Sequence, residues 1–139
     1  MAIRSRVMSV VGAVALGSAA VVIAGAGPAL ASGQYCTSNN DFQICQQVNG
    51  AGTVINWAKG IVTPKNDFGY PFEITMTGIG GGTLCQENFP NTNGDKAQSC
   101  YWNGGGREYL KGNICTAVQY YGGILEGWIQ DGSSCLYVS

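Results

Sequence analysis

Six cysteines are the residues of this chain whose type and number most clearly imply chemistry. None of them forms the Cys-x-x-Cys pair that is typical of a zinc site, whereas an even count in a small secreted domain is typical of disulfides. The sequence therefore predicts three disulfides and no metal site. Six cysteines can pair in many ways. Because a stretch rich in turn residues separates each pair of neighbours, we expect the pairs Cys36–Cys45, Cys85–Cys100 and Cys115–Cys135.

Groups that could act in catalysis are scarce. The chain contains no histidine, which excludes Ser-His-Asp and Cys-His arrangements. Paired carboxylates could act as general acid and base, and the candidates are Glu73, Glu87, Glu108 and Glu126. Glu73 and Glu126 fall on strand positions opposite apolar neighbours, as residues of an ordinary solvated face do. We therefore expect a protein that is not an enzyme and that uses no cofactor.

Three segments rich in glycine or asparagine resemble ligand loops only in composition. Segments 78–82 and 104–106 lack the Lys-Ser or Lys-Thr that follows in a phosphate-binding loop. Segment 91–95 resembles the start of a calcium loop, but it carries one carboxylate, Asp95, where such loops use several. All three are predicted to be turns.

Aromatic residues are the chain's most prominent candidates for binding. Its three tryptophans, seven tyrosines and four phenylalanines all lie after residue 31. Such residues fill small cores, and they are also enriched at protein interfaces and sugar-binding platforms. Adjacent residues of a strand point to opposite faces, so part of the set should be exposed. The sequence predicts a partner-binding surface near the C-terminus, made of Tyr101, Trp102, Tyr120, Tyr121 and Trp128.

The N-terminal segment 1–31 is typical of a signal peptide. Arg4 and Arg6 precede a long apolar run, and the small residues Ala29 and Ala31 follow it. We expect cleavage after Ala31 and a secreted protein without a membrane anchor. An uncleaved anchor is the alternative, because the apolar run approaches the length that spans a bilayer.

The charge of the remaining chain argues against a nucleic-acid partner. Residues 32–139 keep five Lys and Arg against eight Asp and Glu. Nucleic-acid binding depends on clustered cations that neutralise phosphates. Five scattered cations on an acidic domain cannot supply such a patch.

Residues 32–139 are predicted to form a single β domain that begins with a short polar arm, 32–41. Phe72, Ile74 and Met76 alternate with polar residues, as expected for a half-buried strand. Further strands are expected at 43–49, 53–62, 83–87, 98–102, 107–111, 113–121, 124–130 and 135–138.

The separators between these strands are clusters of turn residues. They include segments 103–106 and 131–134, and Gly122-Gly123 is predicted to form a two-residue hairpin turn. Short strands broken by frequent turns favour an all-β fold. We expect a small disulfide-stapled antiparallel sandwich or barrel.

Two stretches resemble small exported proteins of actinobacteria. They are Cys45 to Gly52 followed by Val54, and Lys111 to Cys115 with the closing Cys135. Proteins of this group are single-domain, disulfide-stapled and rich in β-structure. One of them is the adaptor subunit of umbrella toxin particles, which links a toxin scaffold to a lectin-like subunit, partly by strand addition. The resemblance implies an adaptor in an extracellular complex, and it assigns no role to individual residues.

Together these observations predict a secreted, non-enzymatic module that binds another extracellular protein. Two alternatives stay open. In the first, the loop 86–99 closed by Cys85 and Cys100 presents Lys96 as an inhibitor of an extracellular protease. In the second, coplanar aromatic rings bind a glycan or the cell wall.

Overall fold

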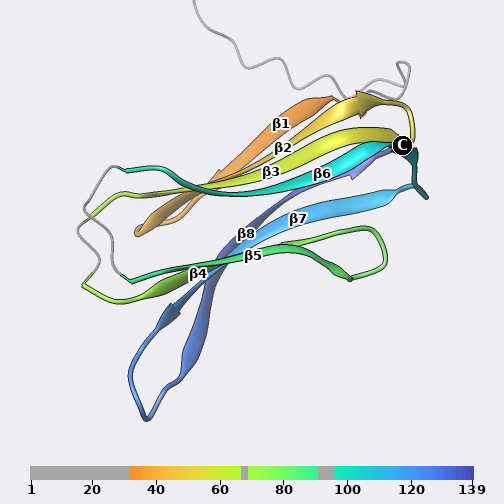
Figure 1. Ribbon diagram of the computed structural model, residues 1–139. Helices are drawn as coiled ribbons and strands as arrows, with labels where there is room; N and C mark the ends of the chain where they lie inside the picture. The colour runs from red at the N-terminus through yellow and green to blue at the C-terminus, as the bar shows by residue number, and fades with distance from the viewer. Residues whose placement is uncertain (1–31, 67–68, 91–95) are drawn as a thin grey trace, which may run out of the picture.

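The computed structural model describes residues 32–66, 69–90 and 96–139, which form two four-stranded antiparallel sheets packed face to face (Figure 1). The first sheet has the order β1 (Gly33–Ser38), β2 (Phe42–Ala51), β3 (Val54–Pro64) and β6 (Gln98–Glu108). The second has the order β5 (Thr83–Phe89), β4 (Phe72–Thr77), β7 (Gly112–Tyr121) and β8 (Trp128–Val138). The predicted all-β fold is confirmed, and it is a sandwich. The described residues contain no helix.

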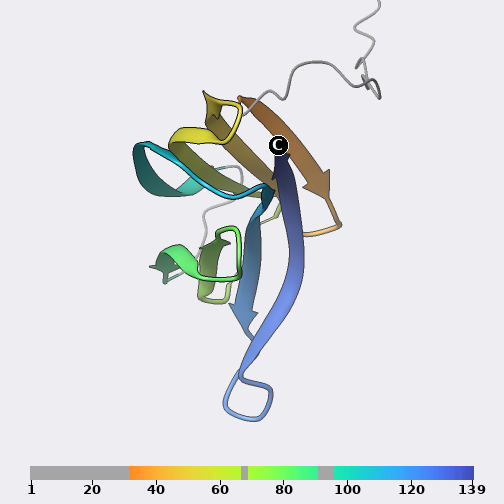
Figure 2. The ribbon, with the colours of Figure 1, turned by 90° about the vertical axis from the view of Figure 1, so that its right-hand side faces the viewer.

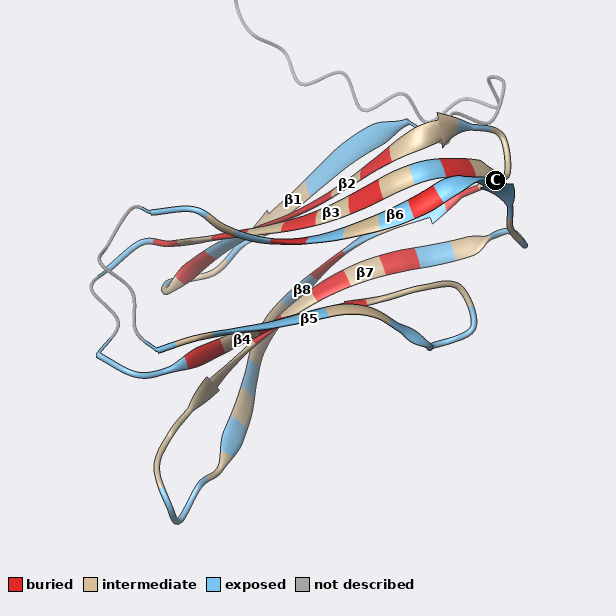
Figure 3. Ribbon diagram, in the orientation of Figure 1, coloured by how far each residue is buried: buried red, intermediate tan, exposed pale blue. Residues whose placement is uncertain are grey.

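Alternating side chains build the core between the sheets. In β4, Phe72, Ile74 and Met76 are fully buried, while the residues between them are only partly buried. Figure 3 shows the same alternation along most of β3 and β7. Period two lets each strand bury one face and leave the other toward solvent. The alternation of apolar and polar residues that predicted these strands therefore also determines which side chains form the core.

Gln46 of β2 makes polar contacts across this core, one with Thr116 of β7 and one with the sulfur of Met76 in β4. The Thr116 hydroxyl of β7 donates a hydrogen bond to Gln46 Oε1 of β2 at 2.5 Å, and both side chains are fully buried. The amide of Gln46 in turn donates to the carbonyl of Gln47 at 2.9 Å. Gly60 of β3 permits the approach, because a Cβ at this position would lie 2.3 Å from Thr116 Oγ1. A glycine in the middle of a strand here marks the close contact of the two sheets.

The three predicted disulfides are confirmed. Cys36–Cys45 joins β1 to β2, and Cys115–Cys135 joins β7 to β8. Cys85–Cys100 joins β5 to β6, which belong to different sheets. This third disulfide therefore ties the two sheets together along one side of the sandwich.

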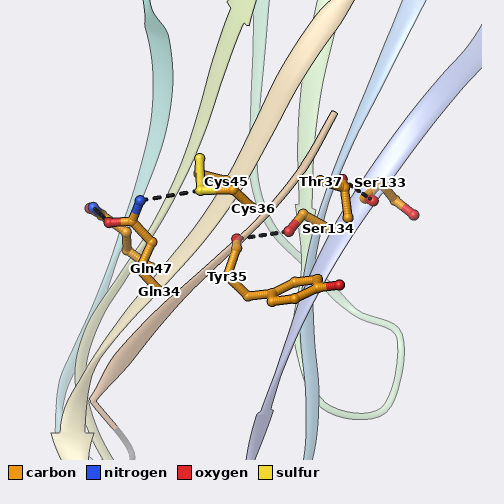
Figure 4. Close-up of a disulfide and its surroundings, with 8 residues drawn as sticks. All are labelled: Gln34, Tyr35, Cys36, Thr37, Cys45, Gln47, Ser133 and Ser134. Carbon is orange, nitrogen blue, oxygen red and sulfur yellow. Dashed lines mark hydrogen bonds between the residues drawn. A yellow bond between two sulfur atoms is a disulfide. The ribbon is translucent and has the colours of Figure 1, made fainter. Parts of the chain in front are cut away.

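Hydrogen bonds close the opposite side, where β1 lies beside β8 (Figure 4). The Ser134 hydroxyl donates to the Tyr35 carbonyl, and the Thr37 hydroxyl donates to the Ser133 carbonyl, each at 2.8 Å. Asn39 Nδ2 donates to the Asp131 carbonyl at 2.5 Å. Since side chains of each strand occupy backbone groups of the other, β1 and β8 cover each other's edges.

Residues 33–38 thus differ from the polar arm expected at 32–41. They pair with β2 in continuous register and carry one end of a disulfide. The segment is polar because β1 is an edge strand with one face toward solvent, not because it extends from the domain.

Two segments predicted as turns lie inside strands. Segment 103–106 belongs to β6, where residues 104–106 form a bulge opposite the single residue Asn56. Segment 131–134 belongs to β8, where Asp131 is the extra residue of another bulge. Glycine with positive φ serves turns and bulges alike, so composition did not distinguish them. Consequently the strands predicted at 98–102 and 107–111 are parts of one strand, which ends at Glu108. Of the strand predicted at 124–130, only 128–130 joins 135–138 in β8.

The hairpin between β7 and β8 is confirmed, but its predicted two-residue turn is wrong. The connection runs over residues 122–127, and β8 begins only at Trp128. Gly122 N–H donates to the Gly127 carbonyl and Gly127 N–H donates to the Gly123 carbonyl, both at 2.9 Å. The loop is therefore longer than expected and closed by its own hydrogen bonds.

Candidate functional site

The connection 122–127 forms the end of a hairpin that projects beyond both sheets (Figures 1 and 2). We call residues 121–128 the hairpin tip. β4 pairs with β7 only as far as Phe72 opposite Tyr120, and the Tyr121 N–H donates one more hydrogen bond to the Pro71 carbonyl, so the connection 122–127 extends beyond β4. Gly123 and Gly127 adopt φ of 113° and 66°, which glycine tolerates best. A Cβ at Gly122 would lie 2.6 Å from the Glu126 carboxylate, so the loop also folds tightly on itself.

The apex of the hairpin tip is apolar and exposed. Ile124 is 94% exposed and Leu125 is 99% exposed, in a loop that two backbone hydrogen bonds hold closed. Adjacent aliphatic side chains on a rigid projection cost solvation free energy in the free protein. Exposed apolar groups gathered in one place are typical of interaction sites.

Two predicted aromatic residues form the base of the tip. Tyr121 and Trp128 are the last pair of the β7–β8 ladder, and their rings lie 5.7 Å apart in an edge-to-face arrangement. Trp128 is 45% exposed, and Tyr121 is partly buried. Tyr120 points to the other face of β7, where it packs against the core and lies 6.3 Å from Tyr70. The tip thus carries Tyr121 and Trp128, with Tyr120 beside it.

The other two predicted residues lie elsewhere. Tyr101 is 56% exposed on β6 of the first sheet, with its ring 6.2 Å from that of Trp57 and tilted by 32°. Trp102 packs inward against the core and meets Tyr109 edge to face at 5.3 Å. The structure therefore divides the expected surface among three places instead of joining it into one.

Trp102 and Tyr109 line an apolar pocket of about 130 Å³. Its other walls include Ile55 of β3, Ile114 of β7, Leu84 of β5, and Ile79 and Gly82 in the β4–β5 connection. The β4–β5 and β6–β7 connections lie at the end of the sandwich opposite the hairpin tip (Figure 1). The molecule thus carries an apolar projection at one end and an apolar recess at the other.

One carboxylate has a shifted titration. Asp131 Oδ2 is buried and has no hydrogen-bond partner among the described residues. Desolvation by burial raises the pKa of Asp131 above its ordinary value of 3.8, and repulsion by Asp41 adds to the rise. A hydrogen bond from the Asn39 side chain opposes it. Asp131 lies on the side of the sandwich that β1 and β8 close, which we call the β1–β8 seam. Its ionisation there affects the stability of the fold.

The four glutamates considered for catalysis do not converge. Glu73 accepts hydrogen bonds from Thr75 and Gln86 at 3.0 and 2.7 Å, and Glu108 accepts one from Thr53 at 3.2 Å. Glu87 and Glu126 are exposed on β5 and on the hairpin tip. Over residues 32–66, 69–90 and 96–139, no group of three His, Cys, Asp or Glu is placed to hold a metal ion.

Part of the predicted inhibitor loop is described. Residues 86–89 belong to β5, 98–99 belong to β6, and Lys96 is exposed. Segment 91–95, predicted as a turn, lies outside the described residues, as does the predicted signal peptide 1–31.

Ile124 and Leu125 were missed as binding residues because they were assigned to a strand. The signal that could have found them is Gly-Gly-Ile-Leu-Glu-Gly at 122–127, in which glycines enclose a short apolar apex. Glycines on both sides of such a segment are typical of a loop.

No protein-family model, no curated protein and no solved structure matches this chain. Three disulfides in so small a domain are consistent with an extracellular location. Within the described part of the chain, no helix is long and apolar enough to cross a membrane.

Proposed function

We propose that this protein is a non-enzymatic binding module that attaches to another extracellular protein through its hairpin tip. The observation that carries the proposal is the pair Ile124 and Leu125, almost wholly exposed at the apex of a hydrogen-bonded loop. A pre-ordered apolar loop loses little conformational entropy on binding, so more of its burial free energy becomes affinity. Trp128 at the base adds the kind of aromatic anchor that dominates many protein interfaces.

A protein suits this surface better than a glycan. Sugars stack on flat aromatic faces, whereas the apex of the tip is aliphatic. Among the described residues, three ring pairs have an exposed member. They are Tyr121–Trp128, Trp57–Tyr101 and Tyr70–Tyr120, and they are tilted by 61°, 32° and 38°. None of these pairs offers two coplanar rings to a sugar chain.

A protein also suits it better than an anionic membrane. Residues 112–139, which include the whole β7–β8 hairpin, contain Glu126 and Asp131 but no Lys or Arg. Loops that bind anionic lipid surfaces rely on nearby cations.

Features of the sequence support the proposed compartment and role. The pattern of residues 1–31 supports export by a signal peptide, and the three disulfides suit an oxidising compartment. The resemblance to small exported actinobacterial proteins supports an adaptor role, including one in an umbrella-type toxin particle. Because β1 and β8 cover each other's edges, we assign binding to the tip and not to strand addition at that seam.

Affinity capture tests the proposal. The oxidised protein is immobilised, exposed to culture fluid of the producing cells, and compared with Leu125→Ser and with the control Tyr137→Ser. Tyr137 is 58% exposed on β8, outside the tip. We expect a protein that the wild type and Tyr137→Ser retain and Leu125→Ser loses. Equal retention by all three would overturn the assignment to the tip.

A further inference from the structure

We propose that one protein bound by the hairpin tip is a second copy of this chain, whose apolar pocket receives Leu125. This inference rests on the proposed function, because it names a partner for the same tip. Its direct basis is that the chain itself carries an exposed aliphatic projection and an apolar recess.

The two features match in size and character. A cavity of about 150 Å³ lined by aliphatic and aromatic side chains holds one benzene molecule and stays dry when empty. The pocket here measures about 130 Å³ and is lined by residues such as Ile79, Leu84 and Trp102. It therefore has room for one branched aliphatic side chain. Leu125, which is 99% exposed, would exchange water for that apolar surface.

The charges around the two features are complementary. Glu126, next to Leu125, is the only charged residue of the tip. Arg107 and Lys111 are exposed on either side of Tyr109, which lines the pocket. Glu108 lies between them and keeps its negative charge, so Arg107, Glu108 and Lys111 together carry a net charge of +1. An acidic tip would thus approach a surface of net positive charge, which favours encounter in the correct orientation.

The positions of the two features determine the kind of assembly. Tip and pocket lie at opposite ends of the sandwich, so a chain cannot fill its own pocket (Figure 1). Insertion of one tip into the next pocket is a head-to-tail contact, in which each copy uses two different surfaces. Such contacts give open chains or rings instead of simple dimers.

Two variants separate the halves of this interface. Leu125→Ser removes the projection, and Gly82→Leu fills the pocket from its wall. A Cβ at Gly82 meets nothing within 4 Å, so the fold should accept the side chain. Gly69→Leu is the matched control, because Gly69 is equally unobstructed and does not line the pocket. Thermal unfolding and circular dichroism establish that each variant is folded.

Sedimentation velocity of the oxidised protein gives the decisive readout. The concentration should reach the millimolar range, because so small an interface binds weakly. We expect wild type and Gly69→Leu to form species larger than dimers, and we expect each single variant to associate at least about tenfold more weakly. An equimolar mixture of Leu125→Ser and Gly82→Leu should form dimers and nothing larger, because it retains one working tip and one working pocket per pair.

A wild-type protein that stays monomeric, or a mixture that stays monomeric, would overturn the inference. If the tip still captures a different protein in that case, the proposed function stands while this inference fails. Pelleting of the wild type, but not of Leu125→Ser, with neutral or anionic lipid vesicles would assign the tip to a membrane and overturn both.

Discussion

The rings of Tyr121 and Trp128 meet edge to face at 5.7 Å across the last pair of the β7–β8 ladder. Aromatic pairs in this geometry attract each other beyond what their buried area contributes. The pair fixes the base of the hairpin tip, while the two hydrogen bonds between its glycines close the loop above. The ring pair and the two hydrogen bonds therefore hold the loop that exposes Ile124 and Leu125.

Replacing Tyr121 by Ala should impair binding far more than folding. We expect partner capture to weaken about thirtyfold or more, since aromatic anchors often contribute about 2 kcal/mol or more. The melting temperature should fall only slightly, because Tyr121 is only partly buried at the edge of the fold. Tyr101→Ala, which removes an exposed ring from the other sheet, is the control for binding and should leave capture unchanged. Equal loss of capture in the two variants would contradict the assignment.

Gly60→Ala should destabilise the sandwich strongly. The new Cβ would lie 2.3 Å from Thr116 Oγ1, so it must displace the hydroxyl that hydrogen-bonds to Gln46. Overpacking a core typically costs about 1–3 kcal/mol, and a buried polar group left without its partner costs a similar amount. Denaturant unfolding should therefore show a loss of at least about 2 kcal/mol.

The matched control for this substitution is Gly82→Ala, where the added Cβ meets nothing within 4 Å. Its stability should stay within about 0.5 kcal/mol of wild type. Similar stabilities for the two variants would show that the sheets do not meet closely at Gly60.

Asp131 should make the folded protein less stable at neutral pH than at low pH. Its pKa is raised in the folded state, mainly by desolvation and further by Asp41, so the folded state holds the proton more tightly than the unfolded state does. The contribution of Asp131 to stability thus falls as pH rises from its ordinary pKa of 3.8 through the raised folded pKa.

Asp131→Asn removes this penalty and tests it. We expect the variant to be more stable than wild type at pH 7. The difference should shrink as the pH falls through the raised folded pKa of Asp131 toward its ordinary value of 3.8, below which residue 131 is neutral in both proteins. Urea unfolding of both proteins across this pH range provides the measurement. A stability difference that is the same at every pH would exclude Asp131 titration as its cause.

Sequence patterns predicted the fold wherever one local rule applied. Alternation placed Phe72, Ile74 and Met76 on the buried face of β4, and turn-rich intervals selected the pairing of all three disulfides. Both signals depend on neighbours close in the chain. The seam between β1 and β8 could not be predicted this way, because Thr37 and Ser133 meet only when two sheets stack.

The candidate site was predicted only in part, for a related reason. Tyr121 and Trp128 were found from composition, but Trp102 turns inward and Tyr101 lies on another sheet. Whether a glycine with positive φ ends a strand or bulges within it depends on the strand opposite. The sequence therefore predicted a strand at Leu125 and a turn at Gly105, whereas Leu125 lies in a loop and Gly105 lies in a bulge within β6.

The most direct test of the central claim is site-specific photo-crosslinking from the apex of the hairpin tip. A photoreactive residue replaces Leu125 in one sample and Tyr137 in another, and each oxidised protein is irradiated in culture fluid of the producing cells. We expect position 125 to crosslink to a protein, which is either a second copy of this chain or a different chain. Excess wild-type protein should suppress this crosslink. We expect no such crosslink from position 137. Equal crosslinking from both positions, or none from position 125, would contradict the claim that the hairpin tip is the binding surface.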